Sequence, residues 1–266
     1  MIPNKKNHPI NYLLAWAVHL FTASGAFIGV LSLVKIHQHD YVTALWLMAI
    51  TVVIDSIDGS FARLVHVKTV LPNIDGALLD NMVDYLNYVI TPAFFFYVNP
   101  HMLPTEYAHW LILAITMTSS YQFCQADAKT PDHFFKGFPC YWNFTAFYMF
   151  IFETSVFTNV LILSTLCILI FVPIKYVYPS RLDYLTKSMN LKILMHASSM
   201  LYGISSALIL WYYPQRDPLL LTLSLGYVLM YLALSIYRTY SPLILAKIST
   251  QKTNNTPASS AASLKK

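Results

Sequence analysis

The feature that most constrains this chain is a series of long apolar segments that covers most of its length. Each has about 20 residues, the length that an α-helix needs to cross the hydrocarbon core of a bilayer. Candidate spans lie at about 13–35, 41–63, 77–98, 107–127, 138–157, 158–178, 192–213 and 218–238. We therefore expect an all-α, polytopic integral membrane helix bundle of about eight transmembrane helices. Six spans are the alternative, because only "FETSVFTN" separates the fifth candidate from the sixth.

The composition supports a membrane protein and excludes several other classes. Hydrophobic residues make up 56% of the 266 residues and charged residues 11%, so a soluble domain of this composition would lack a polar surface. The net charge of +5 does not indicate nucleic-acid binding, because the cations fall between the apolar runs rather than along one face. The three cysteines have no C-x-x-C spacing and indicate neither a disulfide framework nor a zinc knuckle.

The positions of the cations predict how the chain is oriented in the membrane. Cytoplasmic loops carry an excess of Lys and Arg, and eight spans place both termini on the same side. If that side is the cytoplasm, it carries all seventeen Lys and Arg residues except Lys35 and Arg216. We expect one transmembrane catalytic domain at 1–246 and a disordered cytoplasmic tail at 247–266, which is small, polar and basic.

Four carboxylates interrupt the second and third candidate spans. Asp55 and Asp58 are three residues apart, and Asp80 and Asp84 are four apart, so each pair lies on one face of its helix. The loop between the two spans is short enough for the pairs to face each other. Anions inside a membrane need compensation, and an all-oxygen set of ligands suits Mg²⁺ or Mn²⁺. The spacing therefore predicts a metal site near the cytoplasmic surface.

The residues around these carboxylates suit a phosphorylated ligand. Gly59, Ala62 and Gly76 are small and would let a bulky group approach the backbone. Arg63 can bind phosphate oxygens in bidentate fashion, although an anchoring cation at the membrane surface explains it equally well. Asp75 is expected to cap the third span. Two further glycines, at 25 and 29, are expected to form a helix-packing face.

These residues carry a resemblance to a known family. The patterns D-x-x-D-G-x-x-A-R at 55–63 and G-x-x-x-D-x-x-x-D at 76–84 resemble the signature of the CDP-alcohol phosphotransferases, membrane enzymes of phospholipid biosynthesis, at all eight fixed positions. The resemblance implies a six-helix core and metal-ligand roles for Asp55, Asp58, Asp80 and Asp84. It implies that Asp84 is also the general base. It further implies that the cytidine diphosphate site is lined by Gly59, Ala62, Arg63 and Gly76.

Twelve residues separate Arg63 from Gly76, more than in most of the family. This spacing and the segments "DGALLDNMVDYLNYVITP" and "DAKTPDHFFKGFPCYWNF" resemble the bacterial branch that uses choline as the acceptor alcohol. That resemblance implies transfer of the phosphatidyl group of CDP-diacylglycerol to choline with release of CMP. It also implies Mn²⁺ or Mg²⁺ as cofactor, two ions in number, a location in the bacterial inner (cytoplasmic) membrane with the active site cytoplasmic, and a homodimer.

Choline is a quaternary ammonium, which aromatic faces commonly bind. The candidates for this role are Tyr85, Tyr88, Tyr141 and Trp142, although Tyr and Trp are also common at membrane interfaces. Two alternatives remain open. One is the same chemistry with serine, inositol or glycerol 3-phosphate as acceptor. The other is a cation transporter, which would place its carboxylates near the bilayer midplane, whereas here they lie near one surface.

Overall fold

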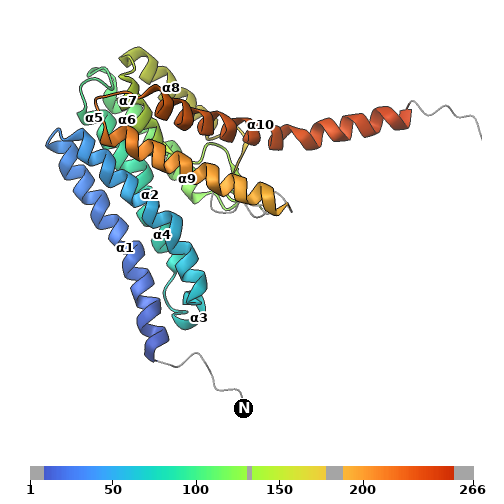
Figure 1. Ribbon diagram of the computed structural model, residues 1–266, viewed down its shortest axis with the longest axis horizontal. Helices are drawn as coiled ribbons and strands as arrows, with labels where there is room; N and C mark the ends of the chain where they lie inside the picture. Colours follow the sequence, from blue (N-terminus) through green and yellow to red (C-terminus); the bar gives the residue numbers. More distant parts are fainter. Residues whose placement is uncertain (1–8, 131–133, 178–187, 255–266) are drawn as a thin grey trace, which may run out of the picture.

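The structure, a computed structural model, describes residues 9–130, 134–177 and 188–254, and most of this part of the chain is helical. Its elements are α1 (Pro9–His37), α2 (Tyr41–Leu64), α3 (Val67–Val70), α4 (Gly76–Tyr85), the π-helix η2 (Leu86–Ile90), α5 (Thr91–Val98), α6 (Ala108–Cys124), β1 (Phe134–Lys136), α7 (Trp142–Phe152), α8 (Val156–Leu169), β2 (Lys175–Val177), α9 (Met189–Trp211) and α10 (Pro218–Asn254) (Figure 1).

Each predicted span has a helical counterpart. The third corresponds to α4, η2 and α5, which follow one another without a break from Gly76 to Val98. Four helices in the described part of the chain are long and apolar enough to cross a membrane: α1, α2, α9 and the 218–241 part of α10. These observations confirm a membrane helix bundle as the fold class.

The predicted boundaries of the fifth and sixth spans are wrong. The break lies at residues 153–155, where Glu153 has a left-handed backbone (φ 47°) and Ser155 caps α8 by accepting a hydrogen bond from the N–H of Thr158. At 11 and 14 residues, α7 and α8 are shorter than the roughly 20 residues of a full span. The end of the predicted sixth span is instead β2, which pairs with β1 in antiparallel fashion.

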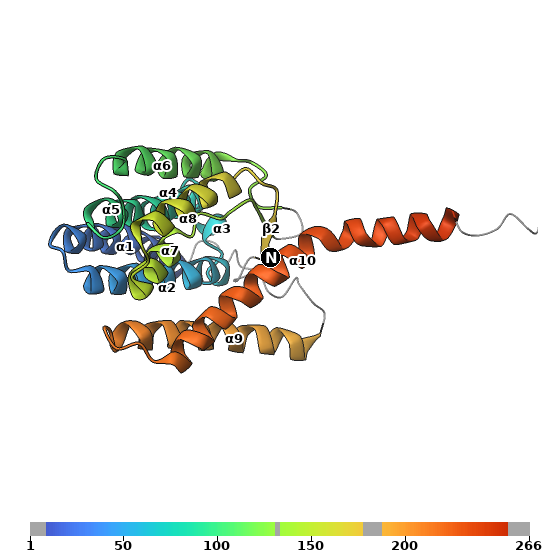
Figure 2. The same cartoon turned by 90° about the horizontal axis from the view of Figure 1, so that it is seen from above.

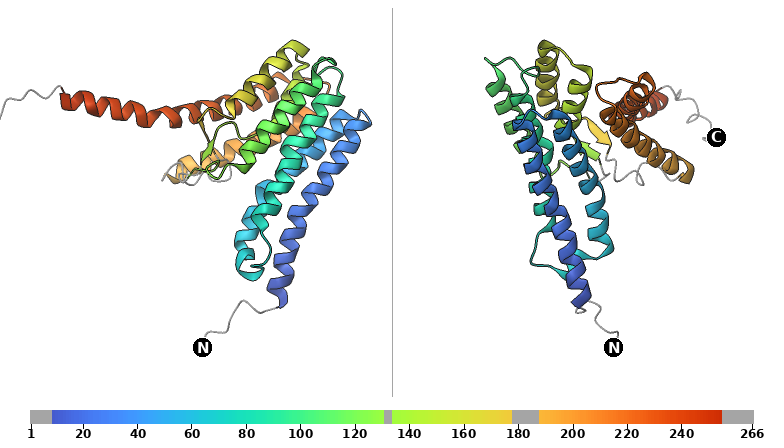
Figure 3. Two further views of the ribbon diagram at one scale, coloured as in Figure 1. Left: turned by 180° about the vertical axis from the view of Figure 1, so that it is seen from behind. Right: turned by 60° about the vertical axis from the view of Figure 1, so that its left-hand side comes forward.

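The last helix extends past the predicted end of the domain. α10 projects beyond the rest of the molecule (Figure 3) and continues to Asn254. The predicted tail at 247–266 is therefore helical at its start, and residues 255–266 lie outside the described residues. The division of the chain at residue 246 stays a prediction.

The helices form two groups. In one, α1 and α2 make an antiparallel pair with α4 and α5 beside α1, and α6 to α8 complete the bundle (Figure 2). In the other, α9 and α10 form a hairpin that contacts the first group through α2 and β2. Hydroxyl groups of α10 join the two groups, since the N–H groups of Lys175 and Val177 donate to Thr239 (2.8 Å) and Ser235 (3.2 Å).

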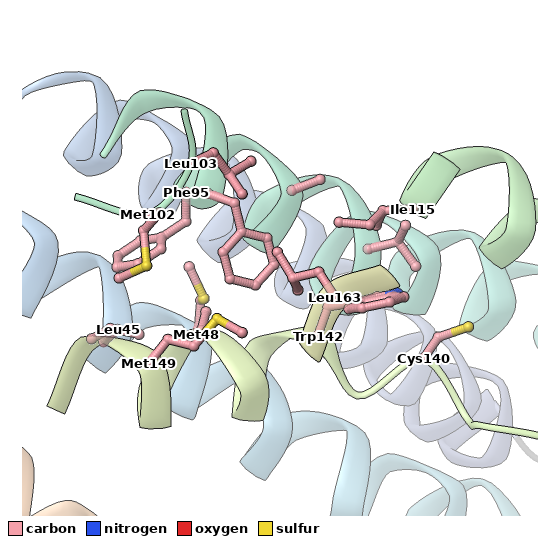
Figure 4. Packing of buried hydrophobic residues seen from close by; sticks show 14 of the residues in the cluster. Leu45, Met48, Phe95, Met102, Leu103, Ile115, Cys140, Trp142, Met149 and Leu163 are labelled. Atoms are coloured by element: carbon pink, nitrogen blue, oxygen red, sulfur yellow. The ribbon is translucent and has the colours of Figure 1, made fainter. Parts of the chain in front are cut away.

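The core of the first group surrounds α5, where Phe95 is fully buried (Figure 4). Trp142 of α7, Leu163 of α8 and Ile115 of α6 are fully buried around it. The indole of Trp142 would leave a donor unpaired in this core, and it donates to Ser119 Oγ at 2.8 Å. This core holds α4 to α8 together and thereby fixes the helix that carries Asp80 and Asp84.

The predicted glycine face on α1 is confirmed. Asn87 of η2 lies against Gly25 and Gly29, and its Nδ2 donates to the carbonyl of Gly25 at 3.2 Å. A Cβ atom at Gly29 would collide with Asn87 Oδ1. The absence of side chains at these two positions therefore allows α1 and the third span to approach closely.

We expect Gly29→Ala to destabilise the protein, since overpacking of a tight contact costs about 1–3 kcal/mol. Gly203→Ala is the matched control, because a Cβ atom at Gly203 of α9 meets nothing within 4 Å and alanine is favoured over glycine inside a helix. Thermal unfolding of the detergent-solubilised chain should show a lower Tm for Gly29→Ala and an equal or higher Tm for Gly203→Ala. Equal Tm values for Gly29→Ala and the unchanged chain would contradict this description of the contact.

Candidate active site

Three of the four predicted carboxylates converge in the structure. Asp55 of α2 and Asp80 and Asp84 of α4 each place one carboxylate oxygen within 4.8 Å of the other two, and all three residues are half-buried. The convergence follows from the sequence, because the loop after α2 reverses the chain and the spacing of four places Asp80 and Asp84 one above the other on α4.

Asp58 lies outside this group of three. It is buried on α2, and its Oδ2 accepts a hydrogen bond of 2.9 Å from the hydroxyl of Thr22 on α1. A carboxylate has two oxygens and can accept several hydrogen bonds or ligate a cation at the same time. Thr22 therefore fixes the orientation of Asp58, and a ligand role for Asp58 stays a prediction.

Asp55 is held by Tyr88, whose hydroxyl donates to Asp55 Oδ2 at 2.7 Å. Tyr88 lies within the π-helix η2, where the N–H of Thr91 bonds to the carbonyl of Leu86. A π-helical turn contains one residue more than an α-helical turn and is frequent at functional sites. This wider turn lets Asn87 contact α1 while Tyr88 reaches Asp55 on α2.

The three converging carboxylates fit a divalent cation. In a Mg²⁺ octahedron with bonds of about 2.1 Å, adjacent oxygen ligands are about 3.0 Å apart and opposite ones about 4.2 Å. Both separations fall within the 4.8 Å limit that the three carboxylate oxygens meet. Like charges at this distance repel strongly where water is scarce. Lys129 interacts electrostatically with Asp80 and Asp84, but one ammonium group cannot neutralise three carboxylates. The donor set is entirely oxygen, which suits Mg²⁺ or Mn²⁺.

The four residues that the resemblance assigns to the nucleotide lie along α2 and at the start of α4. A Cβ atom at Gly59 would meet only the guanidinium of Arg63, at 3.4 Å, so the backbone there is accessible. Arg63 is exposed and donates to Ser60 Oγ at 3.0 Å. Ala62 packs against the small cluster that α1 and α3 form. At Gly76 a Cβ atom would lie 3.0 Å from the ring of His19, so a larger residue would displace that ring.

The start of α4 is set by Asp75, as predicted. Its side chain accepts hydrogen bonds from the N–H groups of Ala77 (3.0 Å) and Leu78 (3.1 Å). These bonds satisfy two of the N–H groups that the first turn of a helix leaves unpaired. The helix therefore begins at Gly76, and this start places Asp80 on its second turn.

The structure brings together only two of the four aromatic residues expected to contact choline. The rings of Tyr88 and Tyr141 are 6.3 Å apart beside Asp55, and Phe135 and Phe144 flank Tyr141. By contrast, the hydroxyl of Tyr85 donates to the carbonyl of Thr116 on α6 at 2.9 Å. Trp142 is fully buried in the core. These bonds direct Tyr85 and Trp142 away from the carboxylates.

Two residues of α1 also lie in this region, although no sequence pattern predicted that α1 contributes to the site. His19 and Thr22 are three residues apart and lie on the buried face of α1. Polar residues on an otherwise apolar membrane helix are a signal of function. Here the signal was available in the sequence, but the partners on α2 and α4 could be identified only in the structure.

The comparisons with known proteins agree with this site. Residues 14–174 match the family described as CDP-alcohol phosphatidyltransferase, a stretch that contains every carboxylate of the site and ends before α9. The match covers more than half of the chain. The chain therefore belongs to the CDP-alcohol phosphatidyltransferase family.

Three relatives indicate where in the family the chain lies. It is 68% identical over 249 residues to a phosphatidylcholine synthase of Legionella pneumophila, which covers 93% of this chain and 98% of that protein. It is 68% identical over 217 residues to a phosphatidylcholine synthase of Legionella bozemanae, covering 82% and 100%. A phosphatidylcholine synthase of Borreliella burgdorferi is 43% identical over 178 residues, covering 67% and 76%.

We expect Tyr88→Phe to weaken metal binding by about 10- to 100-fold, the usual effect of removing a hydrogen bond to a metal ligand. Tyr85→Phe is the control, since it removes a hydroxyl from the same helix that bonds to α6 instead. Free Mn²⁺, measured by electron paramagnetic resonance during titration of the purified chain, gives the affinity directly. Equal Mn²⁺ affinities for both variants would show that the bond between Tyr88 and Asp55 does not support the metal site.

Proposed function

We propose that this chain transfers the phosphatidyl group of CDP-diacylglycerol to choline and releases CMP, which forms phosphatidylcholine. The observation that carries the proposal is the convergence of Asp55, Asp80 and Asp84 from two helices. Membership of the CDP-alcohol phosphatidyltransferase family supports the reaction class. The names of the 68% identical relatives support choline as the acceptor.

In the proposed reaction the hydroxyl oxygen of choline attacks the phosphorus that carries the diacylglycerol. A new P–O bond forms, the P–O bond to CMP breaks, and the hydroxyl proton passes to Asp84. The family resemblance implies this role for Asp84, which follows Asp80 by one turn on α4. Two Mn²⁺ or Mg²⁺ ions held by Asp55, Asp58, Asp80 and Asp84 would stabilise negative charge on the phosphates.

The nucleotide and the acceptor would occupy opposite sides of the carboxylates. Gly59, Ala62, Arg63 and Gly76 lie toward the loop between α2 and α4. This is the side where the accessible backbone of Gly59 and the exposed guanidinium of Arg63 could receive the cytidine and its phosphates. Tyr88 lies on the other side, one turn beyond Asp84 along the third span, and Tyr141 at the start of α7 packs against it.

The pair of aromatic rings suits a quaternary ammonium better than the other acceptors. The rings of Tyr88 and Tyr141 lie 6.3 Å apart, and Tyr88 is bonded to the carboxylate of Asp55. Aromatic rings and a carboxylate both attract a cation that cannot donate hydrogen bonds. Serine, inositol and glycerol 3-phosphate would each need hydrogen-bond donors or cations in this position. Lys129 is the cation that interacts with Asp80 and Asp84, and those carboxylates compete with an anionic acceptor for it.

The proposed setting is the bacterial inner (cytoplasmic) membrane, with both termini and the active site on the cytoplasmic side. In this orientation Lys35 and Arg216 lie on the opposite side. Each is paired with a carboxylate there, Lys35 with Asp40 at 3.5 Å and Arg216 with Glu153 at 2.5 Å. A homodimer, which the family resemblance implies, is part of the proposal and rests on that resemblance alone.

The reaction is tested by incubating the purified chain with CDP-diacylglycerol and Mn²⁺ and with labelled choline, serine, inositol or glycerol 3-phosphate in separate reactions. We expect phosphatidylcholine and CMP from choline, and a loss of at least about 100-fold in Asp84→Asn, since general-base catalysis contributes 10²–10⁴-fold. Asp75→Asn is the matched control, because asparagine also caps helices and so keeps the start of α4, and Asp75 is not one of the converging carboxylates. Removal of Mn²⁺ by EDTA should abolish product formation, and Mn²⁺ should restore it.

Product from a different acceptor would support the transfer mechanism and identify that alcohol, rather than choline, as the acceptor. Absence of product and of CMP from every acceptor, with folded protein, would contradict the transferase proposal. Divalent-cation flux into proteoliposomes would then test the transporter alternative.

We expect Tyr141→Ala to raise KM for choline about tenfold or more, because a desolvated cation–π contact contributes about 2 kcal/mol. Tyr141→Phe retains the ring and should raise it much less. KM for CDP-diacylglycerol should change little in either variant, since Tyr141 lies on the acceptor side. A rise in KM for CDP-diacylglycerol with an unchanged KM for choline would place Tyr141 on the nucleotide side instead.

A further inference from the structure

His19 is a buried histidine that the proposed reaction does not yet use. Only 6% of it is exposed, and its Nε2 has no hydrogen-bond partner within the described part of the chain. Buried polar side-chain atoms in folded proteins are hydrogen-bonded in the large majority of cases. A nitrogen that the protein leaves unpaired at this depth therefore indicates a partner that the chain itself does not supply.

The position of His19 relates it to the nucleotide side of the site. The Cε1–Nδ1 edge of its ring faces Gly76, where an added Cβ atom would lie 3.0 Å from Cε1 and 3.6 Å from Nδ1. Nε2 lies on the other side of Cε1, beyond 4 Å from that Cβ position. Trp16, one turn earlier on α1, packs edge-on against the ring at 6.2 Å. Thr22, nearly one turn later, donates to Asp58. His19 thus lies between the start of α4 and the carboxylate of Asp58.

The neighbouring groups do not compete for Nε2. The hydroxyl of Thr22 is committed to Asp58 Oδ2, and the side chain of Asp75 accepts from the N–H groups of Ala77 and Leu78. Gly76 contributes no side chain. The glycine also leaves room for the ring, because a side chain at position 76 would displace it. The packing therefore fixes the ring beside Gly76, while Nε2 has no partner in the described part of the chain and stays available to a ligand.

We propose that the Nε2–H of His19 donates a hydrogen bond to an oxygen of the CMP portion of CDP-diacylglycerol, which makes His19 a nucleotide-binding residue. The inference deepens the proposed function in that it rests on a nucleotide site beside Gly59 and Gly76, but it does not depend on the identity of the acceptor. The hydrogen bond forms when CDP-diacylglycerol binds and lasts until CMP leaves the site. His19 acts on the donor substrate and not on choline.

The test is calorimetric titration of the full-length, detergent-solubilised chain with CMP in the presence of Mg²⁺. We expect His19→Ala to weaken CMP binding about tenfold or more, as for other hydrogen bonds to charged groups. We expect His19→Gln to bind within about threefold of the unchanged chain, since the amide nitrogen of glutamine reaches the position of Nε2. In steady-state assays His19→Ala should raise KM for CDP-diacylglycerol and leave KM for choline unchanged.

Ser32→Ala is the matched control. Ser32 is buried on the same face of α1, and its hydroxyl donates to the carbonyl of Ala44 at 3.0 Å, so its removal costs a buried hydrogen bond away from the site. Its CMP affinity should equal that of the unchanged chain. If His19→Ala does not fold, His19→Met fills the position without an N–H group and replaces it.

The outcomes separate this inference from the proposed function. Normal CMP affinity in folded His19→Ala or His19→Met would overturn the role of His19 and leave the transferase reaction intact. Weakened binding in His19→Gln as large as in His19→Ala would also overturn it, because a structural role would then explain both. No CMP binding by the unchanged chain would overturn the nucleotide site itself. If the product comes from an acceptor other than choline and CMP binding still depends on His19, the role of His19 is supported and choline as the acceptor is not.

Discussion

The arrangement of the bundle has to hold together three half-buried carboxylates that repel one another. Asp55, Asp80 and Asp84 converge within 4.8 Å, and without a cation their like charges would repel one another. Two helices can hold such groups together only if other contacts press the helices against each other. The core around Phe95 and Trp142 and the bond from Tyr88 to Asp55 supply such contacts. A bound divalent ion would offset the electrostatic repulsion between the carboxylates.

α1 carries no predicted metal ligand, yet it positions three parts of the site. Thr22 orients Asp58, His19 packs on the start of α4, and Gly25 and Gly29 accept Asn87. These contacts occur at successive turns of one helix face, so a shift of α1 along its axis would disturb all three. The tight fit at the glycines resists such a shift. A helix outside the signature therefore determines whether the signature residues meet.

Local patterns predicted the parts of the site that depend on helix periodicity. The spacing of Asp80 and Asp84, the cap at Asp75 and the close packing at Gly29 follow from short-range rules. The directions of Tyr85, Tyr88 and Trp142 could not be predicted, because they depend on the π-helical turn and on partners from α6. The lengths of α7 and α8 were also missed, since apolar composition does not distinguish a full span from two short helices and a strand. The sequence pattern thus identified the chemical groups, and tertiary packing selected which of them face the carboxylates.

The π-helical turn has a consequence for how the third span divides its work. One additional residue rotates everything that follows it by about 100° about the helix axis. The carboxylates of α4 and the buried rings of α5 therefore stand at a different angle to each other than an uninterrupted α-helix would give them. An ordinary α-helix would couple the two, and aligning Phe95 with the core would turn Asp80 and Asp84 away from Asp55. The inserted residue allows the same span to satisfy the geometry of a reaction centre at one end and of a packed interior at the other.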